Sequence, residues 1–309
     1  DPTVNRQSGF LRPQLNRSKI LGTSFYLPYY HVISDNKDYT FKPQIFDSEI
    51  EMFQNEYRQV NKSSKFIADF GITKGYQSSI KGSKRNSIGH FFSKFDKKLN
   101  LKNFETSELD VYLESVSNDT FLNVFKNNII NSSIKPDSLN KLHSGFKITL
   151  DHKNYNFDTG MQVYESLSGH ENDRYEYNFP HYSYSTSLTN SLFRGTFDFS
   201  SDGDNVLNNT NILKTTINNN LSFSSIDYFS NLGFKNNFGL NLRNLNTTGK
   251  NHTVYKSNLQ SQLMSIFEVR STFPLIKKSE KFNEKITPLI SFRLNPGQMK
   301  NLKSRGVNV

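Results

Sequence analysis

Apolar and polar residues alternate with a period of two over many short segments, and this pattern constrains the fold more than any other feature. In 146–150, for example, Phe146, Ile148 and Leu150 alternate with polar residues. Successive side chains of a strand point to opposite faces of a sheet, so each such segment predicts a strand with one apolar and one polar face. We expect further strands at 66–72, 109–116, 193–199, 221–229, 238–245, 253–268 and 288–294.

Stretches rich in Gly, Asn and Asp separate the alternating segments. Because these residues tolerate positive φ, we expect hairpin loops at 81–86, 200–205 and 246–251. The stretch 119–143 is different, since apolar residues such as Phe121 and Phe125 have the spacing of a helical turn. It predicts a short helix or a long loop. At about 18 to 22 residues for each strand with its loop, the 309 residues would form roughly 14 to 16 strands.

The balance of hydrophobic and aromatic residues indicates whether the two faces of such a sheet contact a packed core, lipid or water. Only 34% of the residues are hydrophobic, whereas 14% are aromatic, with 27 Phe and 15 Tyr. A soluble core of this size needs more Leu, Ile and Val, but a barrel with a wet lumen needs apolar groups on one face only. The mean hydropathy of −0.65 is also typical of disordered chains, an alternative that the Phe and Tyr content disfavours.

The longest apolar runs limit how this chain could cross a membrane. None approaches the roughly 20 residues of a membrane-spanning helix, so a membrane-spanning form would have to use strands. We therefore predict an all-β fold in the form of a large antiparallel transmembrane β-barrel.

Several function classes lack support in the sequence. The chain has no Cys, which leaves no disulfide framework, and its 7 His residues lack the spacing of a metal motif. It contains neither a nucleophile-elbow motif nor a phosphate-binding loop. We expect no enzyme activity, no cofactor and no bound metal. The net charge of +10 comes from scattered Lys and Arg, which fits a solvated surface as well as an anionic partner, and we expect no nucleic-acid binding.

Four motifs near the N-terminus follow one another in a specific order. They are R-x-S-G-F-L-x-P at 6–13, P-Y-Y at 28–30, D-x-T-x-x-P at 38–43 and E-Y-R at 56–58. This ordered set resembles the start of the barrel in the LptD family of lipopolysaccharide-assembly proteins, also called organic solvent tolerance proteins (OstA). The matched positions are Arg6, Ser8, Tyr29, Tyr30, Asp38, Thr40, Pro43, Glu56 and Arg58.

Later segments extend the resemblance over nearly the whole chain. The segment 116–122 resembles the family's V-S-D-x-x-F-L stretch, with Asn118 where the family usually has Asp and with Asp119 beside it. The segment 173–180, which contains Arg174 and Pro180, is similar to the D-R-x-x-Y-x-x-P stretch seen particularly in α-proteobacterial members. Phe273-Pro274-Leu275 and Thr287-Pro288 fit a later region of paired strands.

The resemblance implies a location, a function and partners. Residues 1–309 would be the N-terminal and central part of the barrel domain, with a periplasmic domain before them and closing strands after them. The protein would lie in the outer membrane of a Gram-negative bacterium and would insert lipopolysaccharide into the outer leaflet through the barrel lumen and a lateral gate. Its implied partners are lipopolysaccharide, the plug lipoprotein LptE, the periplasmic bridge protein LptA and outer-membrane lipids.

Two prolines indicate where a lateral gate would open. Proline has no backbone N–H to donate to a sheet ladder, so a strand that carries one is weakly paired and normally lies at an edge. In the family, prolines in the first strands accompany the gate, and Pro13 and Pro28 match them, with Gly9, Phe10 and Leu11 close to Pro13. The alternative is that both prolines simply start or end strands and that Gly9 lies in an ordinary turn.

The aromatic residues near the N-terminus and the function as a whole each allow more than one interpretation. Tyr29 and Tyr30 belong either to an aromatic girdle at the membrane interface or to ordinary strand packing. The chain could instead be a passive outer-membrane porin or nutrient channel, which predicts a charged loop that constricts the lumen. A soluble β-rich glycan-binding protein or adhesin is a third possibility, and it would need no detergent to stay in solution.

Overall fold

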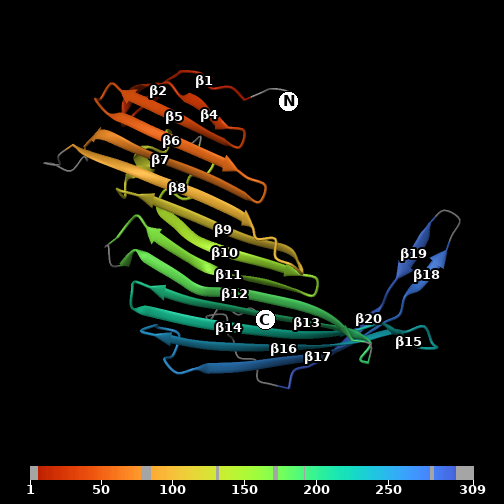
Figure 1. Cartoon of the computed structure of the whole chain (residues 1–309). Coiled ribbons are helices and arrows are strands. Elements are labelled where there is room, and N and C mark those ends of the chain that lie inside the picture. Colours follow the sequence, from red (N-terminus) through yellow and green to blue (C-terminus); the bar gives the residue numbers. More distant parts are fainter. Residues whose placement is uncertain are drawn as a thin grey trace.

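A computed structural model of the chain describes residues 6–77, 85–129, 132–169, 173–190, 192–278 and 282–296 (Figure 1). Within these ranges the chain forms strands and one short helix. The elements are β1 (Gly9–Phe10), β2 (Gln14–Ser18), β3 (Gly22–Tyr26), β4 (Tyr29–Ser34), β5 (Lys37–Phe46), β6 (Glu51–Val60), β7 (Ser64–Tyr76), β8 (Asn86–Lys98), β9 (Phe104–Val116), α1 (Phe121–Val124), β10 (Lys141–His152), β11 (Tyr155–Ser166), β12 (Tyr175–Asn190), β13 (Gly195–Asn208), β14 (Ile212–Ser225), β15 (Tyr228–Phe229), β16 (Lys235–Lys250), β17 (Gln260–Thr272), β18 (Leu275–Lys278), β19 (Asn283–Ile286) and β20 (Leu289–Leu294).

Eighteen of the strands form one antiparallel sheet in which neighbours in sequence are mostly neighbours in space. Three rows of this sheet are each divided into two strands. β1 and β2 pair with β4 and β3, both of which pair with β5, and β14 and β15 both pair with β16. Eighteen strands therefore fill fifteen rows, where the sequence led us to expect fourteen to sixteen unbroken strands.

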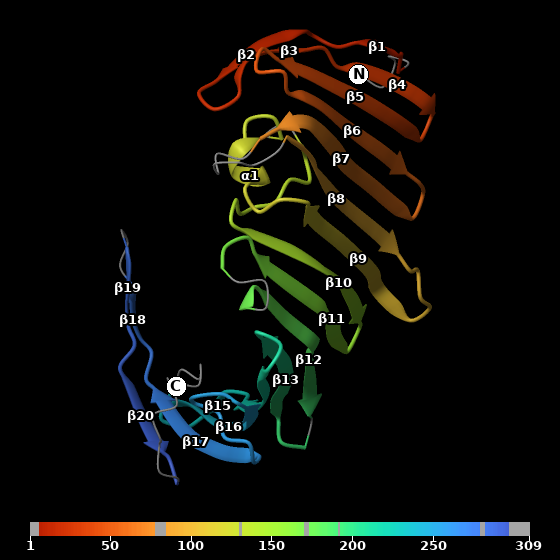
Figure 2. The same cartoon turned by 90° about the vertical axis from the view of Figure 1, so that its left-hand side faces the viewer.

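The sheet is strongly curved but does not close into a barrel. Figure 2 shows the rows following one another around an arc, with α1 on the concave side. Among the described residues, β20 pairs with β17 on one side and with no strand of the first rows on the other. Strands β18 and β19 pair only with each other and project from the last rows. The expectation of an all-β antiparallel fold is thus confirmed, and closure is not observed.

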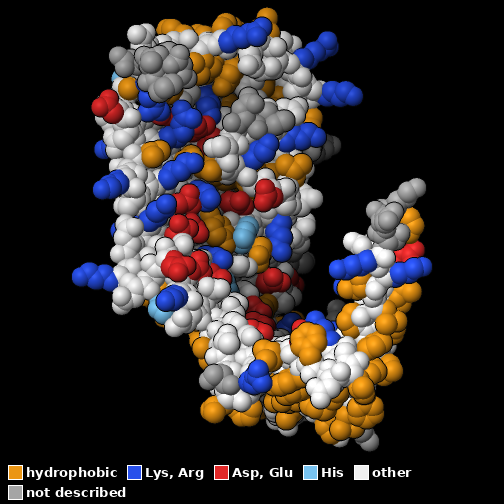
Figure 3. Space-filling model, turned by 90° about the vertical axis from the view of Figure 1, so that its right-hand side faces the viewer, with side chains coloured by type: hydrophobic (Ala, Val, Ile, Leu, Met, Phe, Trp, Pro, Cys, Tyr) orange, Lys and Arg blue, Asp and Glu red, His pale blue; other side chains and the backbone are white. Residues whose placement is uncertain are grey.

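The concave, inner face is polar and the convex, outer face is apolar. On β5 the inner side chains Asp38, Thr40, Lys42 and Gln44 are all buried, whereas Ile45 on the outer face is 56% exposed. Directly paired residues of neighbouring strands share a face, so this division is carried across the sheet by the pairing register. Figure 3 shows acidic and basic side chains gathered in the central part of the face in view.

A small apolar core lies between the inner face and the connection that contains α1. Phe121, Leu122 and Phe125 of this connection are completely buried, and they pack in one cluster with Met52 and Phe92 of the sheet. The spacing of apolar residues in 119–143 therefore predicted the short helix correctly. None of the helical residues in the described ranges forms a helix long and apolar enough to cross a membrane.

Two of the expected hairpin loops are wrong. Residues 200–205 lie inside β13, and residues 246–250 lie inside β16. Short polar residues do not end these strands, because their side chains find hydrogen-bond partners on neighbouring rows, as Asn205 does with Thr215 of β14 at 2.6 Å. Gly203 has a second role, since a Cβ at this position would collide with the ring of Tyr182 on β12. Most of the third expected loop, 81–84, lies outside the described residues.

The expected strands are otherwise found, with different ends. Residues 253–259 precede β17 instead of forming its start, and residues 226–227 interrupt the expected strand 221–229 between β14 and β15. The observed strands are longer than the expected segments in the middle of the sheet, as in β10 around 146–150. Alternation detects the centre of a strand better than its ends, because polar residues on a wet face continue the strand without a hydrophobic signal.

Candidate functional site: a proline-broken edge and an inner charge network

The first two rows of the sheet are both interrupted at a proline. Pro13 lies between β1 and β2, and Pro28 lies between β3 and β4. The pairing of Phe10 with Tyr29 on one side of the break and of Gln14 with Tyr26 on the other differs in register by one residue. One hydrogen bond spans the break, from the backbone N–H of Leu11 to the carbonyl oxygen of Pro28 at 2.8 Å. We call this region, 11–13 and 27–28, the first proline break.

A third proline lies in the next row. Pro43 is inside β5, where its carbonyl accepts a 3.3 Å hydrogen bond from the N–H of Leu27. Three adjacent rows at the free edge thus each carry a residue that cannot donate to a ladder. Pro13 and Pro28 each separate two short strands of an edge row, and their role in a lateral gate stays a prediction.

The last rows of the sheet carry a similar break. Pro274 separates β17 from β18, and Pro288 separates β19 from β20. The N–H of Phe273 donates to the carbonyl of Pro288 at 3.0 Å, so a single backbone hydrogen bond again crosses two facing interruptions. The register is the same on both sides, from Thr272–Leu289 to Leu275–Ile286.

Four of the motif residues meet on the inner face although they come from three separate motifs. The carboxylate of Asp38, which is 2% exposed, binds the guanidinium groups of Arg6 and Arg58, the latter at 2.7 Å. Arg58 also lies 3.5 Å from Glu56. Because Asp38 and Arg58 are directly paired across β5 and β6, the strand register itself places these opposite charges together.

Further residues, which the motifs did not contain, extend this group. Lys42 Nζ lies 2.7 Å from Glu56 and 3.8 Å from Asp69, and His90 Nε2 lies 2.9 Å from Asp69. The amide of Gln54 also donates to both oxygens of Asp69, at 2.9 and 3.0 Å. We refer to Arg6, Asp38, Lys42, Gln54, Glu56, Arg58, Asp69 and His90 as the inner charge network.

Burial explains why the carboxylates of the inner charge network are paired with cations and hydrogen-bond donors. Asp69 and His90 have side chains with no exposed surface, and an uncompensated charge in such a place would be strongly unfavourable. The sequence did offer a signal for the added residues, since Lys42, Gln54 and Asp69 occupy alternating polar positions of their strands. Alternation alone did not indicate which of the many polar positions would be covered.

Two later motif residues also contact each other. Arg174 donates to Asp119 at 3.1 Å and also binds Glu165. This arginine therefore joins the end of β11 to the connection that carries α1. Its hydrogen bond to Glu165, with the negative charges of Glu165 and Asp119, raises the pKa of Arg174 above its ordinary value.

The remaining predicted positions have simpler surroundings. Gly9 and Phe10 form β1, and the rings of Phe10 and Tyr29 pack edge to face with centroids 5.0 Å apart. Ser8 Oγ accepts a 2.9 Å hydrogen bond from the N–H of Val32. Tyr30 pairs with both Gly9 and Thr40, and Thr40 is buried. Pro180 lies inside β12, where the pairing with both neighbouring strands is irregular.

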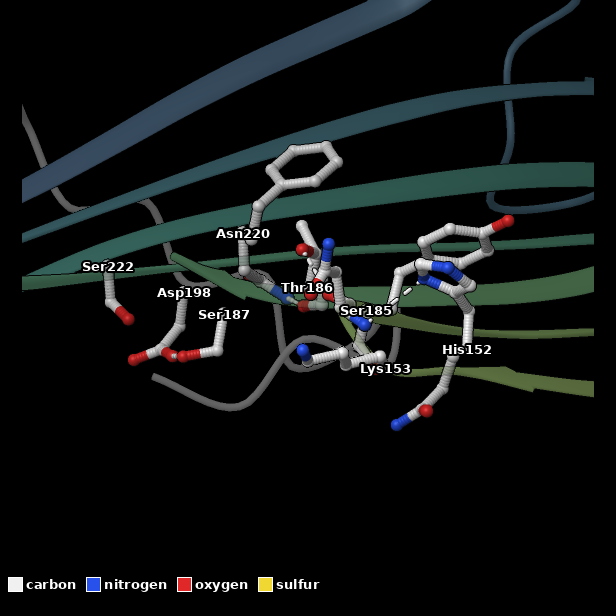
Figure 4. Close-up of a pocket in the computed structure, with 13 residues that line it drawn as sticks. His152, Lys153, Ser185, Thr186, Ser187, Asp198, Asn220 and Ser222 are labelled. Carbon is white, nitrogen blue, oxygen red and sulfur yellow. Dashed lines mark hydrogen bonds between the residues drawn. The ribbon is translucent and has the colours of Figure 1, made fainter. Parts of the chain in front are cut away.

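A pocket of about 420 Å³ lies over the turn between β10 and β11, beside the end of β12 that continues past β11 (Figure 4). Its lining is rich in hydroxyl and amide groups, with Asp198 and Lys153 as its charged side chains. The carboxylate of Asp198 accepts a hydrogen bond from Ser187 at 2.7 Å. Such a lining can hydrogen-bond a polar ligand. No group of His, Asp and Glu residues suited to a metal ion occurs among the described residues.

Comparison with known proteins gives no assignment. No family model matches the chain, and no curated protein matches it in sequence.

Proposed function

We propose that this chain is part of an outer-membrane β-barrel of the LptD type, which passes lipopolysaccharide from the barrel lumen into the outer leaflet. The observation that carries the proposal is the first proline break, which lies at a free edge of a curved sheet with a polar inner face and an apolar outer face. A lipid with a large polar head needs both features. Its head requires a wet path, and its acyl chains require an exit to the hydrocarbon.

The polarity of the two faces supports a membrane location. A protein in water places its apolar face inward, yet Phe70, Ile72, Phe91 and Leu113 on the outer face of the middle rows are between 40% and 56% exposed. An apolar surface that continues over several rows is costly in water and is favoured in lipid. The inner face would then line the lumen.

The first proline break supports the position of the exit. A continuous ladder would have several hydrogen bonds between the first two rows at 11–13 and 27–28, each worth on the order of 0.5 to 1.5 kcal/mol. One remains. Separation of the first row from the second therefore costs less free energy here than in the middle of the sheet. The first row can bend away at this level, so a seam that has this row as one side opens here more easily than elsewhere.

The inner face also has cations that suit a phosphorylated glycolipid. Lys94 and Lys147 belong to the inner face. Lys94 pairs with Ile67, which shares a face of β7 with Asp69. Lys147 pairs with Asp110, which in turn pairs with Asp96. Their side chains are 50% and 45% exposed. Each is paired with one carboxylate, Lys94 with Asp96 at 3.3 Å and Lys147 with Asp158 at 3.1 Å, so a phosphate headgroup would compete with that carboxylate for charge-assisted hydrogen bonds to the ammonium group.

The test uses the complete protein in cells that depend on it for lipopolysaccharide export. A photo-crosslinking residue at Leu11 should capture lipopolysaccharide, whereas the same residue at Leu113, on the outer face of β9, should not. Joint replacement Pro13→Thr and Pro28→Thr should restore ladder bonds and slow export. The matched control is Pro274→Thr with Pro288→Thr, which makes the same chemical change at the other break. Equal capture at both positions, together with unchanged export in the Pro13/Pro28 variant, would refute the proposal.

A passive pore is the second candidate, favoured by one observation. The connection with α1 folds onto the inner face and fills part of the concave space, as a constricting loop would (Figure 2). Its contact with the sheet is apolar, through Phe121 and Phe125, and not a ring of charges. Steady solute conductance of the complete protein in planar bilayers, without lipopolysaccharide capture at Leu11, would favour this candidate.

A further inference from the structure

Three successive connections in the second half of the sheet end in exposed apolar side chains. Strands β12, β14 and β17 run in the same direction, so the segments that follow them lie at one end of the sheet, at the right of Figure 1. Leu192 and Leu232 in two of these segments are 88% and 77% exposed. The full set of exposed apolar residues, which we call the apolar tips, is Leu192, Phe193, Ile226, Phe229, Leu232, Phe234, Leu275, Ile276, Phe282 and Ile286.

The same end of the first half has the opposite character. The turns after β4, β6 and β10 are short and consist of Asp and Asn at 35–36, of Asn, Lys and Ser at 61–63, and of Lys and Asn at 153–154. The turn after β8, at 99–103, also contains two leucines, of which Leu101 is 44% exposed. Polar turns are the ordinary solution for a connection in water. The apolar tips are therefore a local feature of rows β12 to β20 and not a property of this end of the sheet as a whole.

The hairpin of β18 and β19 is the most prominent of the three connections. All eight of its strand residues are exposed, and it is separated from the main sheet by Pro274 and Pro288. The rings of Phe234 and Phe273, whose centroids are 4.7 Å apart, join its base to the preceding connection. Leu275, Ile276 and Ile286 lie near the base of the hairpin, Lys277 and Lys278 occupy the outer part of β18, and Lys285 on β19 pairs with Ile276.

The charges around the apolar tips are mostly positive. Lys277, Lys278 and Lys285 belong to the hairpin, in which Glu284 pairs with Lys277, and Asp227 in the preceding connection binds Lys235 at 2.8 Å. Arg194 lies in the connection after β12, within 5.7 Å of the Tyr228 ring. Separate protruding apolar side chains with cations beside them suit insertion into a layer of anionic headgroups, whereas a protein partner is more often met by a packed groove or a continuous patch.

We propose that the apolar tips and the hairpin lysines bind the surface of a membrane that contains anionic phospholipid. Ile276 would enter the boundary between headgroups and acyl chains, and Lys278 and Lys285, which share its face of the hairpin, would contact lipid phosphates. This binding does not depend on lipopolysaccharide export, because it requires only that the end of the sheet with the tips faces a phospholipid surface.

The absence of native cysteine allows a site-specific test on the full chain. Ile276→Cys and, as the matched position in a polar turn at the same end, Asn61→Cys are each labelled with a polarity-sensitive fluorophore. The protein is placed in bilayer discs of phosphatidylcholine alone or with phosphatidylglycerol. We expect a blue shift and quenching by headgroup-labelled lipid at 276 only, stronger with phosphatidylglycerol and reduced by salt. Each lysine near an anionic surface contributes roughly a fivefold preference, so Lys278→Glu and Lys285→Glu together should abolish the effect of phosphatidylglycerol.

The control variant reverses two lysines at the same end of the first half, Lys97→Glu with Lys98→Glu, and should leave the signal at 276 unchanged. Equal fluorescence at positions 61 and 276 would overturn the proposal. A fluorescence shift at 276 that changes neither with the lipid charge nor with the hairpin lysines would also overturn it. A shift that appears only when a second protein is added would do the same. Lipopolysaccharide capture at Leu11 is independent of these readouts, so failure of either proposal can be recognised separately.

Discussion

The inner face of rows β5 to β8 and the inner face of rows β12 to β16 have similar sequences of alternating polar residues but different surroundings. The first is covered by the connection with α1, and its polar groups are buried and paired with one another. The second is open, and its Ser, Asn and Asp side chains are mostly half-buried or exposed. Whether another segment covers the inner face, and not how polar its residues are, decides whether the polar side chains form a fixed network or a solvated surface.

Covering has an energetic consequence that mutation can measure. Where water is excluded, each polar group depends on a particular partner, and each apolar group that provides the cover contributes its full burial free energy. Where water remains, a lost hydrogen bond is replaced by one to solvent, so the cost is small. The following three changes are ordered from the largest expected effect to the smallest.

Removal of the cover should have the largest effect. Phe121→Ala deletes a completely buried ring and should lower the free energy of unfolding by about 3 to 5 kcal/mol. Val206→Ala, on the inner face of the open half, should cost only about 1 kcal/mol. Denaturant titration of the protein in detergent measures both. Similar losses for the two variants would show that the connection with α1 does not cover the network in solution.

Loss of one charge from the covered half should come next. Asp69→Asn keeps the size of the side chain but removes the negative charge that Lys42 and His90 face, and we expect a loss of about 3 kcal/mol. Asp202→Asn in the open half changes the same group where the side chain is partly exposed, and it should stay within about 0.5 kcal/mol of the unchanged protein. If both substitutions prove equally mild, Asp69 is not isolated from water.

Loss of Arg174, which joins the end of β11 to the connection with α1, should give the smallest of the three effects. Arg174→Gln removes the cation that holds Glu165 and Asp119 together, and Asp119 is partly exposed, so we expect about 1 kcal/mol at low salt and less at high salt. Hydrogen exchange should accelerate in 117–129 more than in β13. A uniform acceleration would instead indicate global destabilisation, without a specific role in fastening the connection.

The sequence predicted a large part of the candidate site but not its geometry. Arg6, Asp38, Glu56 and Arg58 were selected as motif positions, and they contact one another on the inner face. Their partners Lys42, Asp69 and His90 were not selected, because nothing in a period of two distinguishes a polar residue under a cover from one facing water. Pro13 and Pro28 were selected because proline lacks an N–H. That they face each other across one hydrogen bond depends on the register of two rows.

The sequence by itself determined that the chain forms antiparallel strands with one apolar and one polar side, since alternation is a local property that the backbone of a strand converts directly into two faces. It also determined where ladders must be interrupted, since proline has the same defect in any fold. The tertiary structure alone decided which polar residues are covered, which rows form the free edges, and which apolar residues protrude at one end. These depend on curvature and on contacts between residues far apart in the chain, such as Arg6 with Asp38 and Phe121 with Phe92, which no local pattern specifies.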